Sequence, residues 1–363
     1  MRYASIDLLR TFAIVMMVLV HFLENLAGVT WAPAGLGAPL FGFLVGVSYR
    51  IWLRSAESRG TSESAITKST IRRAVFLFLV GFGFNVVVWL PKDTFNWDVL
   101  TLIATAFVLL ALVRTLPPVV PIVFCVLVYL LSPVMRLEAG YEDYWLLGYY
   151  DAEMTLSEVT LGFLVTGYFP VFPWVVFPLV GYLVATHWLP ETQESLTLAA
   201  LRGLLSLGIS LIALFLLIRY GKAWVSDPRL LRMLTGWTMF PASLEYMAGI
   251  LGAILLAFGL GLWLVDGLRG LDRLPGVLAI ARMMSKYSFS IYLLHHLVHV
   301  WPMWGYALWQ GQETTAYWRQ ALTWPWAAAL VPVFLVVCYL FFRWVEKHNF
   351  PTVETAMRWF ADG

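Results

Sequence analysis

The stretch IDLLRTFAIVMMVLVHFLENL, which runs from Ile6 to Leu26, decides the fold class of this chain. A transmembrane helix needs about 20 mostly apolar residues, because every backbone polar group must be hydrogen-bonded within the segment. This stretch is long enough, and it is too long and too polar for a cleavable signal peptide. No small-residue cleavage site follows it, so we expect it to remain in the mature protein. It predicts a first membrane span over residues 5–26.

The composition of the whole chain carries the same signal. Hydrophobic residues make up 60% and charged residues 13% of the 363 residues, against about 45–50% and 25% in a soluble domain. One soluble core cannot bury that excess. The sequence therefore predicts an all-α integral membrane protein, a bundle of about ten transmembrane helices that forms a single domain over residues 1–363. The predicted spans are residues 5–26, 34–53, 74–91, 97–113, 118–135, 171–188, 200–218, 244–265, 287–308 and 325–342.

The distribution of Lys and Arg predicts the orientation, because these residues favour cytoplasmic loops. With the N-terminus inside, only seven of the 24 Lys and Arg residues fall on the far side. Both termini are therefore expected in the cytoplasm. The net charge of +2 gives no electrostatic reason to expect a nucleic-acid partner. The seven far-side residues are Lys92, Arg136, Arg219, Lys222, Arg229, Arg232 and Arg319.

One segment leaves the number of spans open. Residues 152–168 include the half-apolar run TLSEVTLGFLVTGYF, which is short and carries Glu158. We interpret it as an interfacial or re-entrant piece. If it spanned the membrane, the C-terminus would move to the outside, against the charge balance.

Two loops differ in character. The connection from Ser55 to Arg73 is rich in Ser and Thr and ends in a basic pair, which suits phosphate groups. The loop on the far side is acidic and rich in Tyr, which suits a polar or sugar-like acceptor. Its acidic residues are Glu138, Glu142, Asp143, Asp151 and Glu153.

The first helix carries four ionisable residues, Asp7, Arg10, His21 and Glu24. Each costs roughly 2.5–3.5 kcal/mol inside a bilayer, so each is a functional hypothesis by default. Eleven residues at about 100° each place Arg10 and His21 on one face, separated by roughly 16 Å along the axis. Asp7 is spaced to pair with Arg10. The alternatives are that Asp7 and Arg10 mark the interface and that His21 is a hydrogen-bonded structural histidine.

These residues resemble a known pattern. Arg10 and His21, with ten residues between them, are similar to the first-helix signature of the acyltransferase-3 membrane enzymes, which O-acylate cell-surface sugars. The wider run, with APLFGFLVGVSY at Ala38 to Tyr49, resembles bacterial relatives of heparan-alpha-glucosaminide N-acetyltransferase. That resemblance covers essentially the whole chain in order and implies a bacterial or archaeal cytoplasmic membrane. Further matching stretches are IRRAVFLFLVG, FNWDVLTLIATAF, YFPVFPWVVFPLVGYLVA and SKYSFSIYLLHHLV.

The resemblance implies an acyl-CoA-dependent acyltransferase, with acetyl-CoA as the expected donor and a glycan or envelope molecule as the acceptor. The lysosomal enzyme carries Asn at the place of Arg10, so the choice between a hydroxyl and an amine acceptor stays open. Membrane lipids surround the protein, and a homodimer is also left open. The implied catalytic residues are His21, as general base or acyl carrier, Arg10, which orients the donor thioester, and Asp7, which holds Arg10.

Binding roles follow the same resemblance. Arg72, Arg73 and Arg50 are expected to bind the donor phosphates, together with Arg54; the alternative is positive-inside anchoring. Glu24, Asp98 and His295 are expected to bind the acceptor. The alternatives are that Asp98 only starts a helix and that His295 only packs. Finally, Pro39, Gly42 and Gly46 predict a second helix packed closely beside the first.

Metal and redox chemistry find little support in the sequence. His295, His296 and His299 suggest a metal at first, and His295 and His299 lie four residues apart on one helical face. No third ligand or HExxH pattern accompanies that pair, and zinc sites need three or four ligands. We therefore expect no metal. Cys125 and Cys338 both lie inside apolar runs, where a disulfide is not expected.

Two other classes of protein compete with the enzyme. A transporter or lipid-carrier flippase would use the intramembrane Asp, Arg and His as a proton relay, but paired repeats with matching broken helices are not detectable. A scaffold would not need the charged stripe on the first helix.

Overall fold

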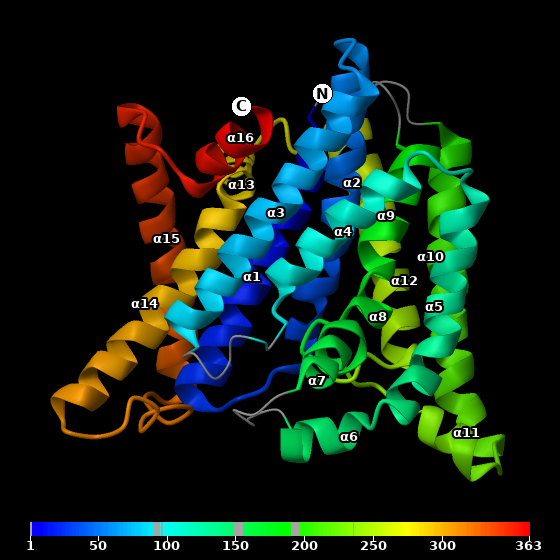
Figure 1. Cartoon of the computed structure of the whole chain (residues 1–363). Coiled ribbons are helices and arrows are strands. Elements are labelled where there is room, and N and C mark those ends of the chain that lie inside the picture. The colour runs from blue at the N-terminus through cyan, green and yellow to red at the C-terminus, as the bar shows by residue number, and fades with distance from the viewer. Residues whose placement is uncertain (1, 90–94, 96, 149–154, 190–196, 235) are drawn as a thin grey trace. The chain divides into compact units, whose positions relative to one another are not determined.

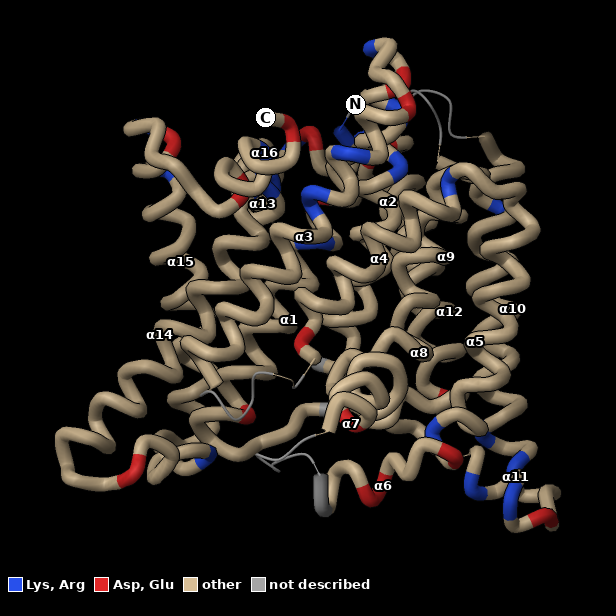
Figure 2. Tube along the Cα trace, viewed as in Figure 1, with Lys and Arg blue, Asp and Glu red and all other residues tan. Residues whose placement is uncertain are grey.

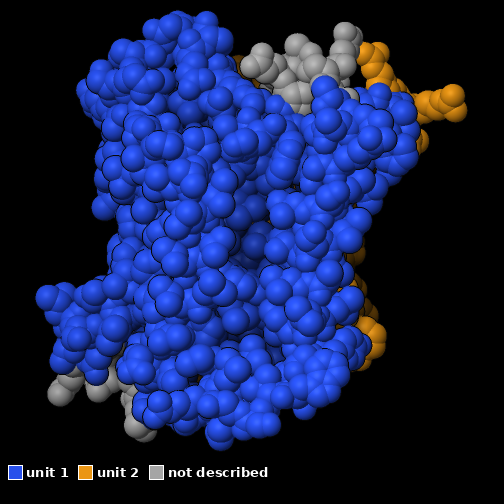
Figure 3. Space-filling model, turned by 90° about the vertical axis from the view of Figure 1, so that its right-hand side faces the viewer, with its two compact units in different colours: residues 1–2, 42–268, 360–363 blue, residues 3–41, 269–359 orange. Residues whose placement is uncertain are grey.

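The computed structural model describes the chain except for residues 1, 90–94, 96, 149–154, 190–196 and 235. Every regular element in this described part is a helix (Figure 1). The chain divides into two compact units, which Figure 3 colours separately. Unit 1 holds residues 1–2, 42–268 and 360–363, and unit 2 holds residues 3–41 and 269–359. The expectation of a single domain over residues 1–363 stays a prediction.

Unit 2 combines two segments that are distant in the sequence, residues 3–41 and 269–359. Its helix α1 packs against α13, α14 and α15, so the charged first helix has three helical partners within this unit. Buried apolar side chains of α1 and of these helices form one core cluster, which includes Ile14, Val18, Ile291 and Phe342. The elements are α1 (Ala4–Ala27), η1 (Ala32–Leu36), α13 (Pro275–Lys286), α14 (Ser288–Trp309), α15 (Trp324–His348) and most of α16 (Val353–Asp362).

Unit 1 contains most of the remaining helices. Its most extensive pairings are α10 with α12 and α3 with α4. The main helices are α2 (Gly37–Ser58), α3 (Glu63–Val88), α4 (Val99–Val113), α5 (Val119–Glu138), α9 (Val176–His187), α10 (Leu198–Gly221) and α12 (Leu244–Gly261). Short elements join them: α6 (Tyr141–Asp143), η3 (Tyr144–Gly148), α7 (Leu156–Leu161), η4 (Gly162–Thr166), α8 (Val171–Trp174), η6 (Lys222–Trp224), α11 (Pro228–Met233) and η7 (Leu262–Gly267).

The predicted fold class is confirmed. Within the described residues, seven helical segments are long and apolar enough to cross a membrane. The other three predicted spans also contain helices: α2 and α14 have 22 residues each, and α4 is a shorter apolar helix of 15 residues. Lys and Arg residues are absent from the middle of α5, α10, α14 and α15 and lie near helix ends (Figure 2). The chain is thus an all-α, multi-pass membrane protein.

The ambiguous segment before α8 is mostly helical in its described part and leads into the candidate span that ends at His187. Helix α7 has six residues, and the π-helical turn η4 that follows has five. At 1.5 Å per residue this is about 16 Å, against roughly 30 Å of hydrocarbon. By itself this part is shorter than a span, but it is continuous with the candidate span Leu156–His187, so the interfacial or re-entrant interpretation stays a prediction. Residues 152–154, together with Lys92, Asp151 and Glu153, lie outside the described residues.

Glycines of the second helix pack on a different partner from the one predicted. A Cβ atom on Gly46 would lie 1.9 Å from the carbonyl oxygen of Pro178, and one on Gly181 would lie 2.0 Å from that of Phe43. Gly42 also faces α9, through Phe177. The backbones of α2 and α9 therefore touch, as small residues allow. The prediction that Gly42 and Gly46 pack against the first helix is wrong, because the face that they share belongs to α9.

Candidate active site

Helix α1 lies alongside α13 and α14. Residues of α1 contact residues of these helices whose numbers are higher by a nearly constant amount. The Arg10 side chain contacts Ser285 and the His21 side chain contacts His296, and both pairs are 275 positions apart. Asn25 meets His299 at a difference of 274. A constant difference over four helical turns means that the two segments run parallel. The face of α1 that carries Arg10 and His21 therefore packs along its length against α13 and then α14.

His21 lies against two imidazoles of α14. Its Nδ1 atom is 3.0 Å from Nε2 of His296 and 3.4 Å from Nε2 of His295. The ring centroid of His21 is 4.4 Å from that of His296 and 5.0 Å from that of His295. Both α14 histidines are buried, whereas His21 is partly exposed. The three rings form the polar centre of unit 2.

Backbone carbonyls determine the protonation of two of these histidines. Nδ1 of His295 faces the carbonyl oxygen of Tyr292, and Nδ1 of His299 faces that of His295. A carbonyl only accepts hydrogen bonds, so each Nδ1 carries the proton and each Nε2 is a lone pair when the ring is neutral. The lone pair of His295 is directed at His21, and the lone pair of His299 accepts from the Asn25 amide at 2.8 Å.

Arg10 and His21 lie at opposite ends of a polar stripe along one face of α1, and Arg10 is at the N-terminal end. It donates a hydrogen bond of 2.6 Å from Nη1 to the hydroxyl of Ser285, at the end of α13. On the next residue, the hydroxyl of Thr11 donates to the carbonyl of Ala281 at 3.2 Å. Asp7 is buried one turn before Arg10. The predicted role of Asp7 in holding Arg10 stays a prediction.

Glu24 forms an ion pair at the end of α1. Its carboxylate lies 3.2 Å from Nη2 of Arg319, and the two side chains are 36% and 56% exposed. The loop that carries Arg319 is also fixed by backbone bonds: Arg319 N–H donates to Asn25 and Leu322 N–H to Leu26, both at 2.9 Å. Glu24 is thus accessible to a ligand but already has a cationic partner.

A cavity of about 590 Å³ lies beside this cluster, entirely within unit 2. His299 is part of its wall, and the His299 ring is 5.5 Å from that of His296. Phe22, Tyr306 and Tyr317 supply aromatic walls, and Gln320 supplies an amide. A largely apolar pocket with a few polar groups is the usual form of a small-molecule site.

The basic residues predicted to bind the donor lie in unit 1 and differ in their contacts. Arg50 is paired with Glu57 at 3.3 Å, and the guanidinium of Arg73 stacks on the Trp52 ring at 4.4 Å. Within the described residues, Arg72 makes no side-chain hydrogen bond or ion pair. Lys68, one turn earlier on α3, is exposed and likewise has no such contact with the described residues. Lys68 and Arg72 therefore form a cationic pair available to a ligand.

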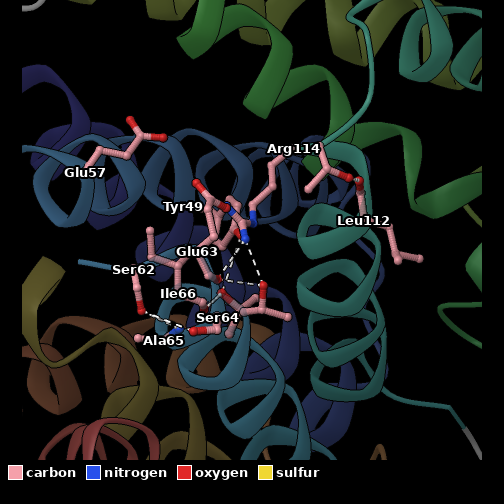
Figure 4. A network of polar contacts seen from close by, with 12 residues as sticks. Tyr49, Glu57, Ser62, Glu63, Ser64, Ala65, Ile66, Leu112 and Arg114 are labelled. Atoms are coloured by element: carbon pink, nitrogen blue, oxygen red, sulfur yellow. Dashed lines mark hydrogen bonds and ion pairs between the residues drawn. The ribbon is translucent and has the colours of Figure 1, made fainter. Parts of the chain in front are cut away.

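Two other arginines have structural contacts. Arg54 donates to the carbonyls of Ala185 and Leu189, both at 2.9 Å, and so satisfies the end of α9. Arg114 joins the end of α4 to the start of α3 (Figure 4). It contacts the carboxylate of Glu63 and donates to the Thr67 hydroxyl at 2.8 Å.

Asp98 serves as the N-cap of α4. Its carboxylate accepts from the backbone N–H of Val99 at 2.6 Å. This is the helix-starting role that the sequence left as the alternative. Its predicted contact with the acceptor stays a prediction.

Sequence reasoning did not single out four residues that the structure places in polar contacts. Asn25 and Ser285 bind predicted site residues, and Arg319 pairs with Glu24. Glu245 is buried in unit 1, with Arg219 at 2.7 Å and Lys222 at 3.3 Å. Asn25 lies four residues after His21, so helical spacing was a usable signal for it. The others depend on long-range contacts, for which a single sequence holds no signal.

Comparison with known proteins matches one family model to the part of the chain that contains most of the candidate site residues. The model of the family described as heparan-alpha-glucosaminide N-acetyltransferase, catalytic, matches residues 2–217, more than half of the chain. No curated protein matches the chain. The matched region contains Arg10, His21 and the basic residues of α3. It ends before α14, so His295 and His296 lie outside it.

Proposed function

This chain belongs to the heparan-alpha-glucosaminide N-acetyltransferase catalytic family, and from that premise we propose that it moves an acetyl group across a membrane. The donor is acetyl-CoA on the cytoplasmic side. The acceptor is a hydroxyl or amine of a glycan or envelope molecule on the opposite side. The family resemblance expected from the first helix is confirmed by the match. Membership of an acetyltransferase family supports the reaction class; the donor and the acceptor are our proposal.

The observation that carries the proposal is the hydrogen-bonded position of His21. Its Nδ1 atom faces two Nε2 atoms of α14, and the His295 Nε2 is an acceptor. When His21 carries its proton on Nδ1, that proton is donated to the α14 pair and Nε2 keeps its lone pair. An imidazole oriented in this way by a neighbouring acceptor is the usual arrangement of a general base. His295 then positions the base, in addition to its predicted contact with the acceptor.

The proposed reaction follows from this tautomer. Nε2 of His21 removes the proton from the acceptor as its oxygen or nitrogen attacks the thioester carbonyl. The C–S bond breaks, and the departing thiolate of CoA takes the proton back from the imidazolium. In the alternative route, His21 itself receives the acetyl group before the acceptor does.

Arg10 is proposed to bind the donor away from the reacting carbonyl. It lies about 16 Å from His21 along the α1 axis, because eleven residues separate them. That separation favours contact with a polar group of the CoA arm over the predicted contact with the thioester. Ser285 orients the guanidinium.

The phosphates of CoA are assigned to the cationic pair of Lys68 and Arg72. Phosphate oxygens accept charge-assisted hydrogen bonds from such groups. Within the described part of the protein neither side chain makes a hydrogen bond or an ion pair, whereas Arg50 and Arg54 have polar partners. Arg73, which lies against Trp52, is paired with Asp362 at 3.3 Å, so it contributes less free positive charge than Lys68 and Arg72.

The cavity beside His299 is proposed to admit the acceptor. Its aromatic walls offer surfaces on which a sugar ring stacks, and Gln320 and His299 offer polar contacts. Glu24 and Arg319 lie at the same end of α1.

The experiment is to incubate purified, reconstituted protein with labelled acetyl-CoA and a preparation of envelope glycans. Transfer of label that depends on the intact protein is expected. Saturable CoA binding is expected even without an acceptor. Absence of both would contradict the proposal and favour a transporter.

A further inference from the structure

The three imidazoles of the His21 cluster have the spacing of metal ligands. One ring nitrogen from each of His21, His295 and His296 lies within 4.8 Å of the other two. Two of these separations are 3.0 Å and 3.4 Å. In a tetrahedral zinc site with Zn–N bonds of about 2.0–2.1 Å, neighbouring nitrogens are roughly 3.3–3.4 Å apart. Small side-chain movements therefore bring the cluster to coordination geometry.

We propose that His21 Nδ1, His295 Nε2 and His296 Nε2 bind one divalent transition metal ion, with zinc as the preferred ion. Imidazole nitrogens suit zinc, and three protein ligands with one open position are typical of exchangeable or reactive sites. The fourth position takes water, hydroxide or an anion. The sequence alone argued against a metal because the α14 histidines lacked a third ligand; α1 provides it from 274 positions away.

The surroundings of His295 support this assignment. Histidine ligands usually donate their second ring N–H to a carbonyl or carboxylate, which fixes the lone pair toward the metal. His295 has this arrangement, because its Nδ1 faces the Tyr292 carbonyl while its Nε2 faces the cluster. His21 is partly exposed, which leaves one side of the cluster accessible.

Metal binding has a consequence that rests on the proposed function. A neutral imidazole bound to a metal through Nδ1 carries its proton on Nε2. That nitrogen then has no lone pair with which to accept the acceptor's proton. Zinc at this position therefore inhibits acetyl transfer, and its removal restores activity.

The binding test uses the full-length protein, stripped of metal with a chelator and held in detergent. Equilibrium dialysis against zinc is expected to give one ion per chain. Cobalt substitution is expected to give the intense visible absorption of a tetrahedral site, and X-ray absorption to give a shell of about three imidazoles. His296→Ala should weaken zinc binding at least tenfold. His187→Ala, which changes a histidine at the end of α9, should leave it unchanged.

The outcomes are separable. Failure of the wild-type protein to bind zinc, or equal loss of binding in both variants, would overturn the site; the spectroscopy of the wild-type protein makes this independent of how well His296→Ala folds. Zinc that binds but raises the rate of transfer would overturn the inhibitory role. If the metal-free protein transfers no acetyl group, the proposed function fails, and the dialysis result still decides the metal site.

Discussion

Arg10 donates a 2.6 Å hydrogen bond to the hydroxyl of Ser285, 275 positions later in the chain. The same difference in residue number separates His21 from His296. The donor-side and base-side ends of the polar stripe are therefore positioned by the same pair of parallel segments. A change that disturbs one end without moving the other allows their roles to be tested separately.

Ser285→Ala is expected to raise KM for acetyl-CoA and to leave kcat nearly unchanged. The substitution removes a hydrogen bond to a charged group, and such a bond contributes about 1.5–3 kcal/mol. The Arg10 guanidinium then loses the hydroxyl that orients it. Steady-state kinetics measure the two constants. Ser290→Ala is the matched control, because its hydroxyl also binds a charged group, Glu354, at 2.7 Å. Equal effects of both substitutions on KM would argue against a donor role for Arg10.

The fold was largely predictable because its signal is local. Each span is a run of apolar residues whose length is set by the bilayer, so the residues of one helix suffice to find it. The stripe of Arg10 and His21 was also predictable, since both lie on one helix and helical geometry relates them. Helix ends were less predictable: α3, for example, begins at Glu63, well before the predicted residue 74, because its first turns are polar.

The partners of the stripe were not predictable. His21 meets α14, and that pairing depends on which of many apolar helices packs against α1. A single sequence does not contain that information, and the same reason hid Ser285 and the third imidazole of the cluster. Gly46 is a similar case: the small residue correctly predicted a close helix contact, but the partner was α9.

Gly46→Ala is expected to prevent stable folding of unit 1. The added Cβ would lie 1.9 Å from a backbone carbonyl oxygen of Pro178, which no side-chain rotation relieves. The measurement is the midpoint of thermal unfolding in detergent, together with the yield of monodisperse protein.

Gly83→Ala is the control for this prediction. It lies on an exposed part of α3, and among the described residues outside its own helical turns no atom lies within 4 Å of an added Cβ. Alanine there should stabilise the helix by roughly 0.5–1 kcal/mol. A Gly46→Ala protein as stable as the Gly83→Ala protein would show that α2 and α9 do not touch.

Replacement of Lys68 and Arg72 together by Gln is expected to weaken CoA binding at least about tenfold, because charge-assisted hydrogen bonds to phosphate are lost. Thermal stability should be little changed, since neither side chain makes a hydrogen bond or an ion pair within the described residues. Isothermal titration of CoA measures the affinity.

Arg54→Gln should show the reverse pattern. It removes hydrogen bonds to the end of α9, so stability falls while the affinity for CoA is kept. Unchanged CoA affinity in the Lys68/Arg72 double variant would mean that these cations of α3 serve only as positive-inside anchors.

The predicted orientation places Ser62 in the cytoplasm and Asp143 outside. Ser62 is the exposed N-cap of α3, and Asp143 ends the short helix α6. Single cysteines introduced at these two positions, with Cys125 and Cys338 replaced by Ala, should react with a membrane-impermeant maleimide from opposite sides. Reaction of both from the same side of sealed vesicles would refute the predicted orientation.

The prediction for His21 concerns the chemical step itself. His21→Ala removes a polar side chain that is costly to bury in a membrane, so the protein should insert and fold about as well as before. The rate of acetyl transfer should fall by roughly 10²–10⁴-fold, the usual contribution of a general acid or base. The rate is measured in reconstituted vesicles with labelled acetyl-CoA, and folding is monitored by circular dichroism.

His295→Ala is the comparison that separates proton transfer from positioning. This change leaves His21 in place with the Nε2 of His296 still 3.0 Å from its Nδ1, so one oriented neighbour remains. The loss of rate should therefore be smaller than for His21→Ala, and part of it should appear as weaker binding of the acceptor. A stable His21→Ala protein with near-normal transfer, alongside an inactive His295→Ala protein, would assign the base to α14 instead of α1.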